Sequence, residues 1–328
     1  MTGSESGLRA YGEPRTSDPE LLPSPAMDSP ATSAPGSGSV SACLVVRHEE
    51  AVIDRCLASL DGVVDEIVLV HDGECEDRTL EIAERHGCRV FERPLIGHRE
   101  GPAVFAYQAA QGEWILTIDA DEYLSEPLRQ ALCELVQDGQ VNGYEFLWPR
   151  WDGQRYITES GPYKLALFRR AHAHLVGLIH DVERIDPPIR RVDLRIEHRP
   201  QYNNVALGTV LTKWRRWARI NAREFLTPFP DLPKFNWDGP SDWPPRRRLL
   251  NRLSPLLFLP YVPVVFLINL WRERDVYGVR ENLRMALYQG LYAGMVQFYV
   301  AKCTYLGSDD APASEPPRPG AVPSRPPR

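Results

Sequence analysis

The segment Trp114–Glu122 constrains this chain more than any other part of its sequence. It begins as an apolar, strand-favouring run and ends in three acids, Asp119, Asp121 and Glu122. Carboxylates at the end of a buried strand repel one another and lose hydration, so they need an opposing charge. Two carboxylates separated by one residue can both reach a hard cation such as Mg²⁺ or Mn²⁺, which also holds substrate phosphates. The other interpretation is a polar turn before a helix that begins near Glu126.

The composition is that of a globular protein with no nucleic-acid footprint. The chain has 328 residues, 43% of them hydrophobic and 25% charged, with a formal net charge of −6. Its six cysteines show no Cys-x-x-Cys spacing, which favours a reducing compartment. We therefore expect a cytoplasmic protein.

The chain divides into four predicted parts. Residues 1–38 are rich in Ser, Pro, Gly and Ala and residues 307–328 in Pro and Arg, so both are expected to be disordered. No secretory signal opens the sequence. Residues 39–200 are predicted to form a catalytic domain, and residues 201–306 a helical extension with apolar, membrane-associating segments.

An alternation of strands and helices runs through the first part of the predicted catalytic domain. Strands are expected at Val40–Val46, Ile67–Val70 and Cys88–Phe91, with an amphipathic helix before the second and a helix over Asp77–His86 before the third. This succession predicts an α/β fold with a mostly parallel, doubly wound sheet flanked by helices.

Two acids mark the expected ligand edge of this sheet. Ligands bind at the carboxyl ends of parallel strands, where Asp72 and Asp119 are both predicted to lie. The chain has neither a G-x-G-x-x-G after its first strand nor a G-x-x-x-x-G-K-[ST], which argues against hydride-transfer enzymes and P-loop NTPases. Acids and a metal in place of a Gly-rich loop indicate nucleotide-sugar chemistry.

A series of short motifs between residues 40 and 200 carries a family resemblance. The motifs are Arg47-His48-Glu49-Glu50, Cys56-Leu57-Ala58-Ser59-Leu60, Asp72 with Asp77 and Thr79, Gly112–Glu122, Leu167-Phe168-Arg169-Arg170, and Gly177-Leu178-Ile179-His180-Asp181. With this combination the chain resembles family 2 glycosyltransferases of the GT-A fold, especially the bacterial branch that acts on lipopolysaccharide cores and other cell-envelope glycans. The resemblance implies a Rossmann-like GT-A domain.

The resemblance also implies roles for the acids. Asp72 would contact the nucleobase and ribose of the donor, Asp119 the ribose and the metal, and Asp121 the metal, which is Mn²⁺ or Mg²⁺. Inverting transfer needs a base that takes the proton of the acceptor hydroxyl, and Asp181 matches the family position for it. The partners implied are a nucleotide-sugar donor and a glycan or lipid-linked acceptor.

Other polar and aromatic residues have weaker assignments. The family's Arg-Asn pair is replaced by Ala103-Val104, and Arg99 is the expected substitute as a diphosphate contact. His180 adjoins the predicted base and is a candidate metal ligand or diphosphate donor. Trp148 either stacks on an acceptor or belongs to the core.

Two uncharged runs in the last third, Leu253–Trp271 and Met285–Ala301, have flanking arginine or lysine residues. The first would span about 28 Å as a straight helix, but three prolines argue against that. We expect helices that lie in, or dip into, the cytoplasmic leaflet, which makes the protein peripheral or monotopic on the inner face of the plasma membrane. Buried helices that pack on the catalytic domain or on a second protomer are the alternative.

The sequence thus predicts a metal-dependent inverting glycosyltransferase that moves a sugar from a nucleotide donor to an envelope glycan or lipid-linked acceptor. A catalytically silent, glycan-binding or scaffolding module of the same fold at the membrane is the first alternative. Glu74-Cys75 and the missing Arg-Asn pair favour it, whereas the intact acid cluster does not. A nucleotidyltransferase is a further alternative, but Arg47-His48-Glu49-Glu50 is not the Gly-rich basic loop that it would need.

Overall fold

A computed structural model describes residues 38–158, 161–201, 203, 206–274 and 278–307. Apart from Gly38 and Gly307, the two terminal segments predicted to be disordered lie outside these residues. The strands of the large sheet end at residue 198 and the long helices start at residue 207, on either side of the predicted boundary at residue 200.

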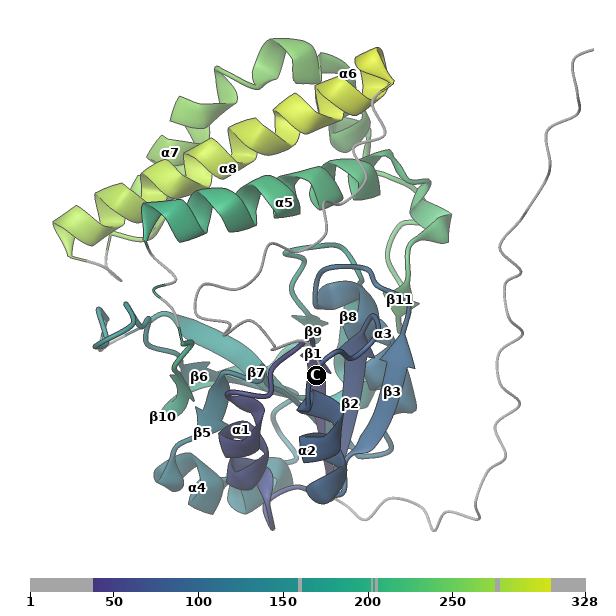
Figure 1. Ribbon diagram of the computed structural model, residues 1–328, viewed down its shortest axis with the longest axis vertical. Helices are drawn as coiled ribbons and strands as arrows, with labels where there is room; N and C mark the ends of the chain where they lie inside the picture. The colour runs from purple at the N-terminus through teal and green to yellow at the C-terminus, as the bar shows by residue number, and fades with distance from the viewer. Residues whose placement is uncertain (1–37, 159–160, 202, 204–205, 275–277, 308–328) are drawn as a thin grey trace, which may run out of the picture. The chain divides into compact units, whose positions relative to one another are not determined.

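The first half of the large sheet is parallel (Figure 1). Strands β1 (Val40–Val46), β2 (Glu66–Asp72), β3 (Arg89–Arg93) and β4 (Trp114–Thr117) stand in the order β3-β2-β1-β4. All three pairings are parallel. The strands β2 and β4 therefore flank β1, and their carboxyl ends reach the same edge of the sheet.

The second half of the sheet changes direction, so the whole sheet is mixed. The order continues from β4 through β7 (Tyr163–Arg169), β6 (Gly143–Leu147) and β10 (Ile189–His198) to β5 (Glu122–Leu124). The pairings of β7 with β4 and β6, and of β10 with β5, are antiparallel. The expected α/β, GT-A-like fold is confirmed, and the antiparallel part brings the end of β10 beside the acid cluster.

Helices pack on both faces of the large sheet. Successive side chains of β1, the strand between β2 and β4, point to the two faces in turn. Ala42 and Leu44 of β1 belong to one hydrophobic cluster, and Cys43 belongs to the other. The first cluster contains the buried side chains of α1 (Ile53–Leu60), α2 (Thr79–Arg85) and α4 (Glu126–Gln137), and the second contains those of α3 (Glu100–Ala109). The α4 helix begins where the sequence predicts.

A small antiparallel sheet adjoins α3. It pairs β8 (Ala173–Val176) with β9 (Arg184–Ile185) and with β11 (Lys234–Phe235). Phe235 packs with its ring centroid 5.7 Å from that of Tyr107 on α3. The loop between β8 and β9 contains the motif Gly177–Asp181, so the small sheet sets the position of the predicted base.

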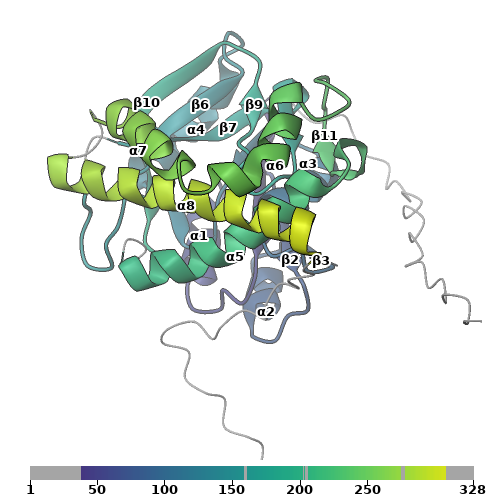
Figure 2. The same ribbon diagram turned by 90° about the horizontal axis from the view of Figure 1, so that it is seen from above.

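The helical extension consists of α5 (Leu207–Leu226), α6 (Pro245–Leu257), α7 (Tyr261–Arg272) and α8 (Val279–Leu306). In Figure 2, α5, α6 and α7 lie along α8, and all three contact it. In the described residues no single helix is both long and apolar enough to cross a membrane. Only the pair α6 and α7, bent by 116° at the break between them, reaches that length and composition together. The straight helix considered for Leu253–Trp271 is thus not formed, because the break falls beside Pro260.

Candidate active site

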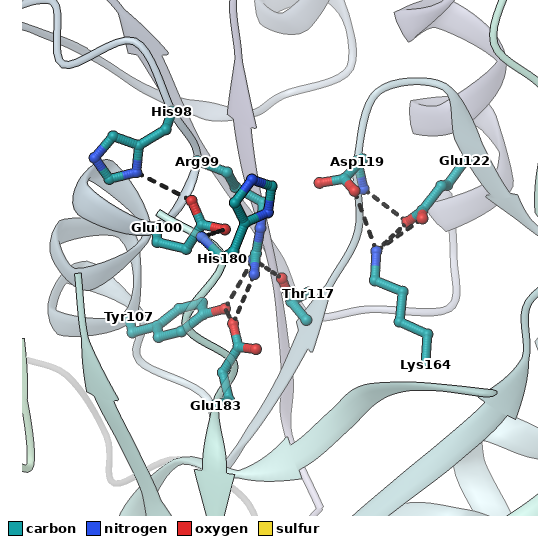
Figure 3. Close-up of polar contacts among 10 residues, drawn as sticks. All are labelled: His98, Arg99, Glu100, Tyr107, Thr117, Asp119, Glu122, Lys164, His180 and Glu183. Atoms are coloured by element: carbon teal, nitrogen blue, oxygen red, sulfur yellow. Dashed lines mark hydrogen bonds and ion pairs between the residues drawn. The ribbon is translucent and has the colours of Figure 1, made fainter. Parts of the chain in front are cut away.

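The acid cluster forms a tight turn between β4 and β5 (Figure 3). The backbone N–H of Asp119 donates to Glu122 Oε2 (2.9 Å), and the N–H of Glu122 donates to the carbonyl oxygen of Asp119 (2.9 Å). The Glu122 side chain is fully buried, whereas that of Asp121 is 25% exposed. Glu122 therefore holds the turn together, and Asp121 stays open to a ligand.

A lysine from β7 supplies the opposing charge that the sequence assigned to a metal. Lys164 Nζ donates to both oxygens of Glu122 (2.8 and 2.6 Å) and to Asp119 Oδ2 (3.2 Å). Burial acts to raise the pKa of Asp119, but the charge of Lys164, helped by that of Arg99, keeps this pKa below its usual value. Burial together with the nearby Asp119 charge raises the pKa of Glu122. Lys164 therefore supplies part of the opposing charge that the sequence analysis assigned to a divalent cation.

Two aromatic rings complete the surroundings of the acids, and one of them is a histidine that the sequence analysis missed. His198 Nε2 lies 3.5 Å from Asp121 Oδ2, and His198 stands directly opposite Glu122 in the pairing of β10 with β5. The Trp148 ring stacks on His198 at 4.5 Å, and its indole N–H donates to Glu122 Oε1 (2.6 Å). Trp148 is therefore part of the support of the acid cluster. A histidine at the end of an alternating strand was the available signal.

A divalent cation fits this group of donors only with help from a ligand. In the described part of the chain, no three His, Cys, Asp or Glu side chains are gathered so that they could hold a metal ion. Asp121 and His198 offer a carboxylate and an imidazole side by side, a pair that suits Mn²⁺, and His198 Nδ1 is buried with no hydrogen-bond partner among the described residues. Metal binding by Asp119 and Asp121 together stays a prediction, because Lys164 already contacts Asp119.

Arg99 reaches the end of β4, just before the acid turn, but its guanidinium is already engaged. It donates to Thr117 Oγ1 at the end of β4 (2.9 Å) and to Glu183 Oε1 (3.1 Å). Glu183 is buried and also accepts a hydrogen bond from the Tyr107 hydroxyl (2.5 Å). These partners fix the direction of Arg99 while its side chain keeps 24% of its surface exposed. A contact to a diphosphate stays a prediction.

Asp72 ends β2 and is buried. Its two carboxylate oxygens accept hydrogen bonds from the backbone N–H groups of Ile96 and Gly97, both at 2.7 Å. Asp72 therefore fixes the loop before α3, which carries Arg99. A hollow of about 520 Å³, lined by residues including Arg47, Gly73 and Leu95, opens beside this strand end. The predicted contact of Asp72 with nucleobase and ribose stays a prediction.

The loop after β8 holds the two remaining predicted residues. Gly177 lies where a Cβ atom would come within 3.0 Å of the Gly101 Cα atom on α3, so the loop can pack closely on that helix. Asp181 Oδ2 is buried and accepts no hydrogen bond among the described residues, and the Arg184 guanidinium is 3.7 Å away. Burial raises the pKa of Asp181, which favours a role as proton acceptor.

His180 points toward the helical extension. Its ring contacts those of Trp217 and Tyr292, with centroids 4.9 and 5.2 Å apart, and burial lowers its pKa. Its backbone has a positive φ of 62°, and its N–H donates to Glu100 Oε1 (3.0 Å). His180 therefore fixes the loop by its backbone, and its predicted contact with metal or diphosphate stays a prediction.

A buried histidine with two carboxylates joins this loop to α3 and α5. His98 Nδ1 lies 3.0 Å from Glu100 Oε2, and Nε2 lies 2.7 Å from Glu224 Oε1. Glu224 also accepts the backbone N–H of Ile179 (2.9 Å). Burial alone would lower the pKa of His98, but Glu100 and Glu224 raise it to about 9. The histidine is therefore charged at neutral pH and holds the loop that carries Asp181.

His98→Gln is expected to destabilise the protein at pH 7 by about 3 kcal/mol, because it leaves two buried carboxylates without their cation. The folded-state pKa of about 9 exceeds the usual value of 6.5, so this stability is fully present below pH 6.5 and is lost as the pH rises through 9. Urea unfolding between pH 6 and pH 10 should show this loss in the wild type and not in the variant. His172→Gln, at a 44% exposed histidine, is the control and should change little.

The sequence comparisons identify the part of the chain that carries these residues. Residues 41–178 match the model of the family described as Glycosyl transferase family 2. This segment is a family 2 glycosyltransferase domain. An uncharacterized glycosyltransferase of Rickettsia bellii is 38% identical to the chain over 93 residues, 28% of this chain and 31% of that protein. The lipopolysaccharide core biosynthesis glycosyltransferase LpsC of Rhizobium meliloti is 32% identical over 102 residues, 30% of this chain and 37% of that protein.

The matched regions are about a third of the length of these relatives. Among solved structures, S. aureus TarS 1-349 is similar with 15% identity and a TM-score of 0.39, over 82% of this chain and 92% of that one. Glucosyl-3-phosphoglycerate synthase from Mycobacterium tuberculosis, in complex with Mn²⁺, uridine diphosphate and glucosyl-3-phosphoglycerate, is similar with 17% identity and a TM-score of 0.39, over 64% and 91%. The family 2 domain contains Asp119, Asp121 and Lys164, whereas Asp181 and His198 follow it in the chain.

Proposed function

We propose that this protein transfers a sugar from a nucleotide-sugar donor to an acceptor hydroxyl with inversion at the anomeric carbon. The observation that carries the proposal is the acid turn at the end of β4, where Asp121 stays open beside His198 while Lys164 and Glu122 hold the turn rigid. A ligand at this edge of the sheet meets fixed groups that need no rearrangement.

The donor nucleotide would lie across the ends of β2, β1 and β4. The hollow beside Gly73 has room for a nucleobase, and Arg99, which contacts Thr117 at the end of β4, would approach the diphosphate. Asp121 and His198 would hold a Mn²⁺ or Mg²⁺ ion. The bound cation would offset the negative charge that develops on the departing diphosphate.

The proton of the acceptor hydroxyl would pass to the Asp181 carboxylate. As that O–H bond breaks, the acceptor oxygen forms a bond to the anomeric carbon, and the bond from this carbon to the diphosphate oxygen breaks. The electron pair leaves with the nucleoside diphosphate. The buried Oδ2 of Asp181, which accepts no hydrogen bond from the described residues, supports this role, because burial makes the carboxylate a stronger base.

The acceptor would be an envelope glycan or a lipid-linked saccharide. The name of LpsC, a lipopolysaccharide core biosynthesis glycosyltransferase, supports this class of acceptor. The site would then work on the cytoplasmic side of the plasma membrane, where nucleotide sugars are available to it.

Calorimetric titration of nucleoside diphosphates and nucleotide sugars, with Mn²⁺ or with EDTA, tests the donor half of the proposal. One nucleotide should bind with Mn²⁺ and lose most of its affinity in EDTA. Asp181→Asn tests the transfer half: donor affinity should stay within about twofold, while turnover should fall by about 10²-fold or more, since positioned bases contribute 10²–10⁴-fold. Absence of binding across the panel would instead favour a catalytically silent module, and unchanged turnover would exclude Asp181 as the base.

A further inference from the structure

The helices α6 and α7 present an exposed apolar face, which we call the α6–α7 face. Eight large apolar side chains on it have between 37% and 73% of their surface exposed: Leu249, Leu253, Leu256, Leu259, Val264, Leu267, Ile268 and Trp271. No residue of α7 is buried, although this helix is almost wholly apolar. Exposed large apolar side chains gathered on two consecutive helices and the break between them are typical of a binding surface on a folded protein.

The inner side of the two helices is already occupied by α8. A Cβ atom at Gly294 of α8 would come within 2.5 Å of Val262 Cγ2 and 2.9 Å of the Phe258 carbonyl oxygen, so the helices cross in close contact. Tyr305 near the end of α8 donates its hydroxyl hydrogen to the Arg252 carbonyl oxygen (2.8 Å). The exposed apolar side chains therefore cannot be buried by a small rotation of α6 or α7.

Within α6, α7 and the break between them every charged residue is an arginine, and the two flanking acids, Asp242 and Glu273, pair with Arg248 and Arg272. Residues 245–272 include five arginines and no acidic residue, in a chain whose formal net charge is −6. Arg246 and Arg252 are exposed on α6, and Arg272 is exposed at the end of α7. An apolar surface with arginines at both ends complements a layer of anionic head groups over hydrocarbon.

The dimensions favour a position within one leaflet. The 13 residues of α6 and the 12 of α7 give helices of about 20 Å and 18 Å, shorter than the roughly 30 Å hydrocarbon core of a bilayer. The bend of 116° between them prevents the pair from acting as one straight rod. Neither helix alone can span the hydrocarbon core of a bilayer. The arginines at both ends suit a helix pair that lies along the interface between membrane and water.

We propose that the α6–α7 face docks on the surface of a bilayer that contains anionic phospholipids, with its leucines in the outer hydrocarbon and its arginines among the phosphates. The proposal concerns where the chain works, and it stands whether or not the proposed sugar transfer is correct. It gives a lipid-linked acceptor a route to the protein.

Co-sedimentation of the full chain with vesicles tests the docking surface. The wild type should bind vesicles of phosphatidylcholine mixed with phosphatidylglycerol and bind pure phosphatidylcholine far less. Leu256→Asp with Leu267→Asp should weaken binding by at least about tenfold, because both side chains lose their place in hydrocarbon. Arg246→Gln with Arg252→Gln should weaken binding to the anionic vesicles by about tenfold and reduce its dependence on salt.

Ile189→Asp is the matched control, because Ile189 is an apolar residue of β10 that is 42% exposed. It should leave vesicle binding unchanged. Thermal unfolding confirms that each variant is folded, and nucleotide titration on the same variants separates docking from donor binding. Undiminished binding of the double aspartate variant, or no binding of the wild type to either vesicle, would overturn the proposal.

Discussion

Asp121→Ala is expected to remove metal-dependent nucleotide binding and to lower turnover by more than about 10²-fold, because the carboxylate that would hold the cation is lost. The fold should survive the change. The Asp121 side chain is 25% exposed, and the turn is held by Glu122 and Lys164 and not by Asp121. Calorimetry with the nucleotide that the wild type binds, in Mn²⁺ and in EDTA, measures the first effect, and a radiolabelled sugar-transfer assay the second.

The control for this variant is Glu84→Ala, which removes an exposed carboxylate on α2. It should leave affinity, turnover and unfolding temperature unchanged. A variant Asp121→Ala that still binds the nucleotide only when Mn²⁺ is present would show that the cation is held elsewhere. His198→Ala would then be the next variant, and it should weaken Mn²⁺-dependent binding by about 10-fold or more if His198 is a ligand.

The parallel half of the sheet was predictable because each of its elements has a local signature. Strands such as Val40–Val46 are mostly apolar runs, and α1 before β2 has a clear apolar periodicity, whereas α3 between β3 and β4 has none and was not predicted. The second half of the sheet, which is mixed because β10 pairs parallel with β6 and antiparallel with β5, was not predictable in this way. The pairing of β10 with β6 and β5 depends on contacts between residues far apart in the chain, and β10 carries many charged residues.

The site was predictable where the chemistry lies within one segment and not where it comes from distant strands. The acid turn and the end of β2 were found from local sequence. Lys164 and His198 were missed, since each stands alone among residues with no motif of its own, and only the sheet brings them to the acids. The break within Leu253–Trp271 was predictable for a local reason, because its prolines argue against a straight helix.

Lys164 offers a direct test of what neutralises the acid cluster. Lys164→Met leaves Asp119 and the fully buried Glu122 side by side without their cation, and this should lower the free energy of unfolding by about 3–5 kcal/mol at neutral pH. The carboxyl pKa values of the folded variant then lie above those of the unfolded chain. The free energy of unfolding therefore falls as the pH rises from the unfolded-state pKa through the folded-state pKa. The deficit in urea unfolding should therefore be smaller at pH 5 than at pH 8.

The double variant Lys164→Met with Glu122→Gln separates charge from packing. The double variant should have a free energy of unfolding roughly 1–3 kcal/mol higher than Lys164→Met, which is the size of the interaction energy between contacting residues in double-mutant cycles. Arg190→Met is the matched control: it removes a cation that pairs with Asp138 at 2.6 Å on the surface and should cost about 1 kcal/mol or less. If the lysine is the resident counter-charge, Mn²⁺ should stabilise Lys164→Met more than the wild type, because the cation then replaces a missing charge. Equal stability of wild type and Lys164→Met at pH 8 without metal would contradict this account of the acid turn.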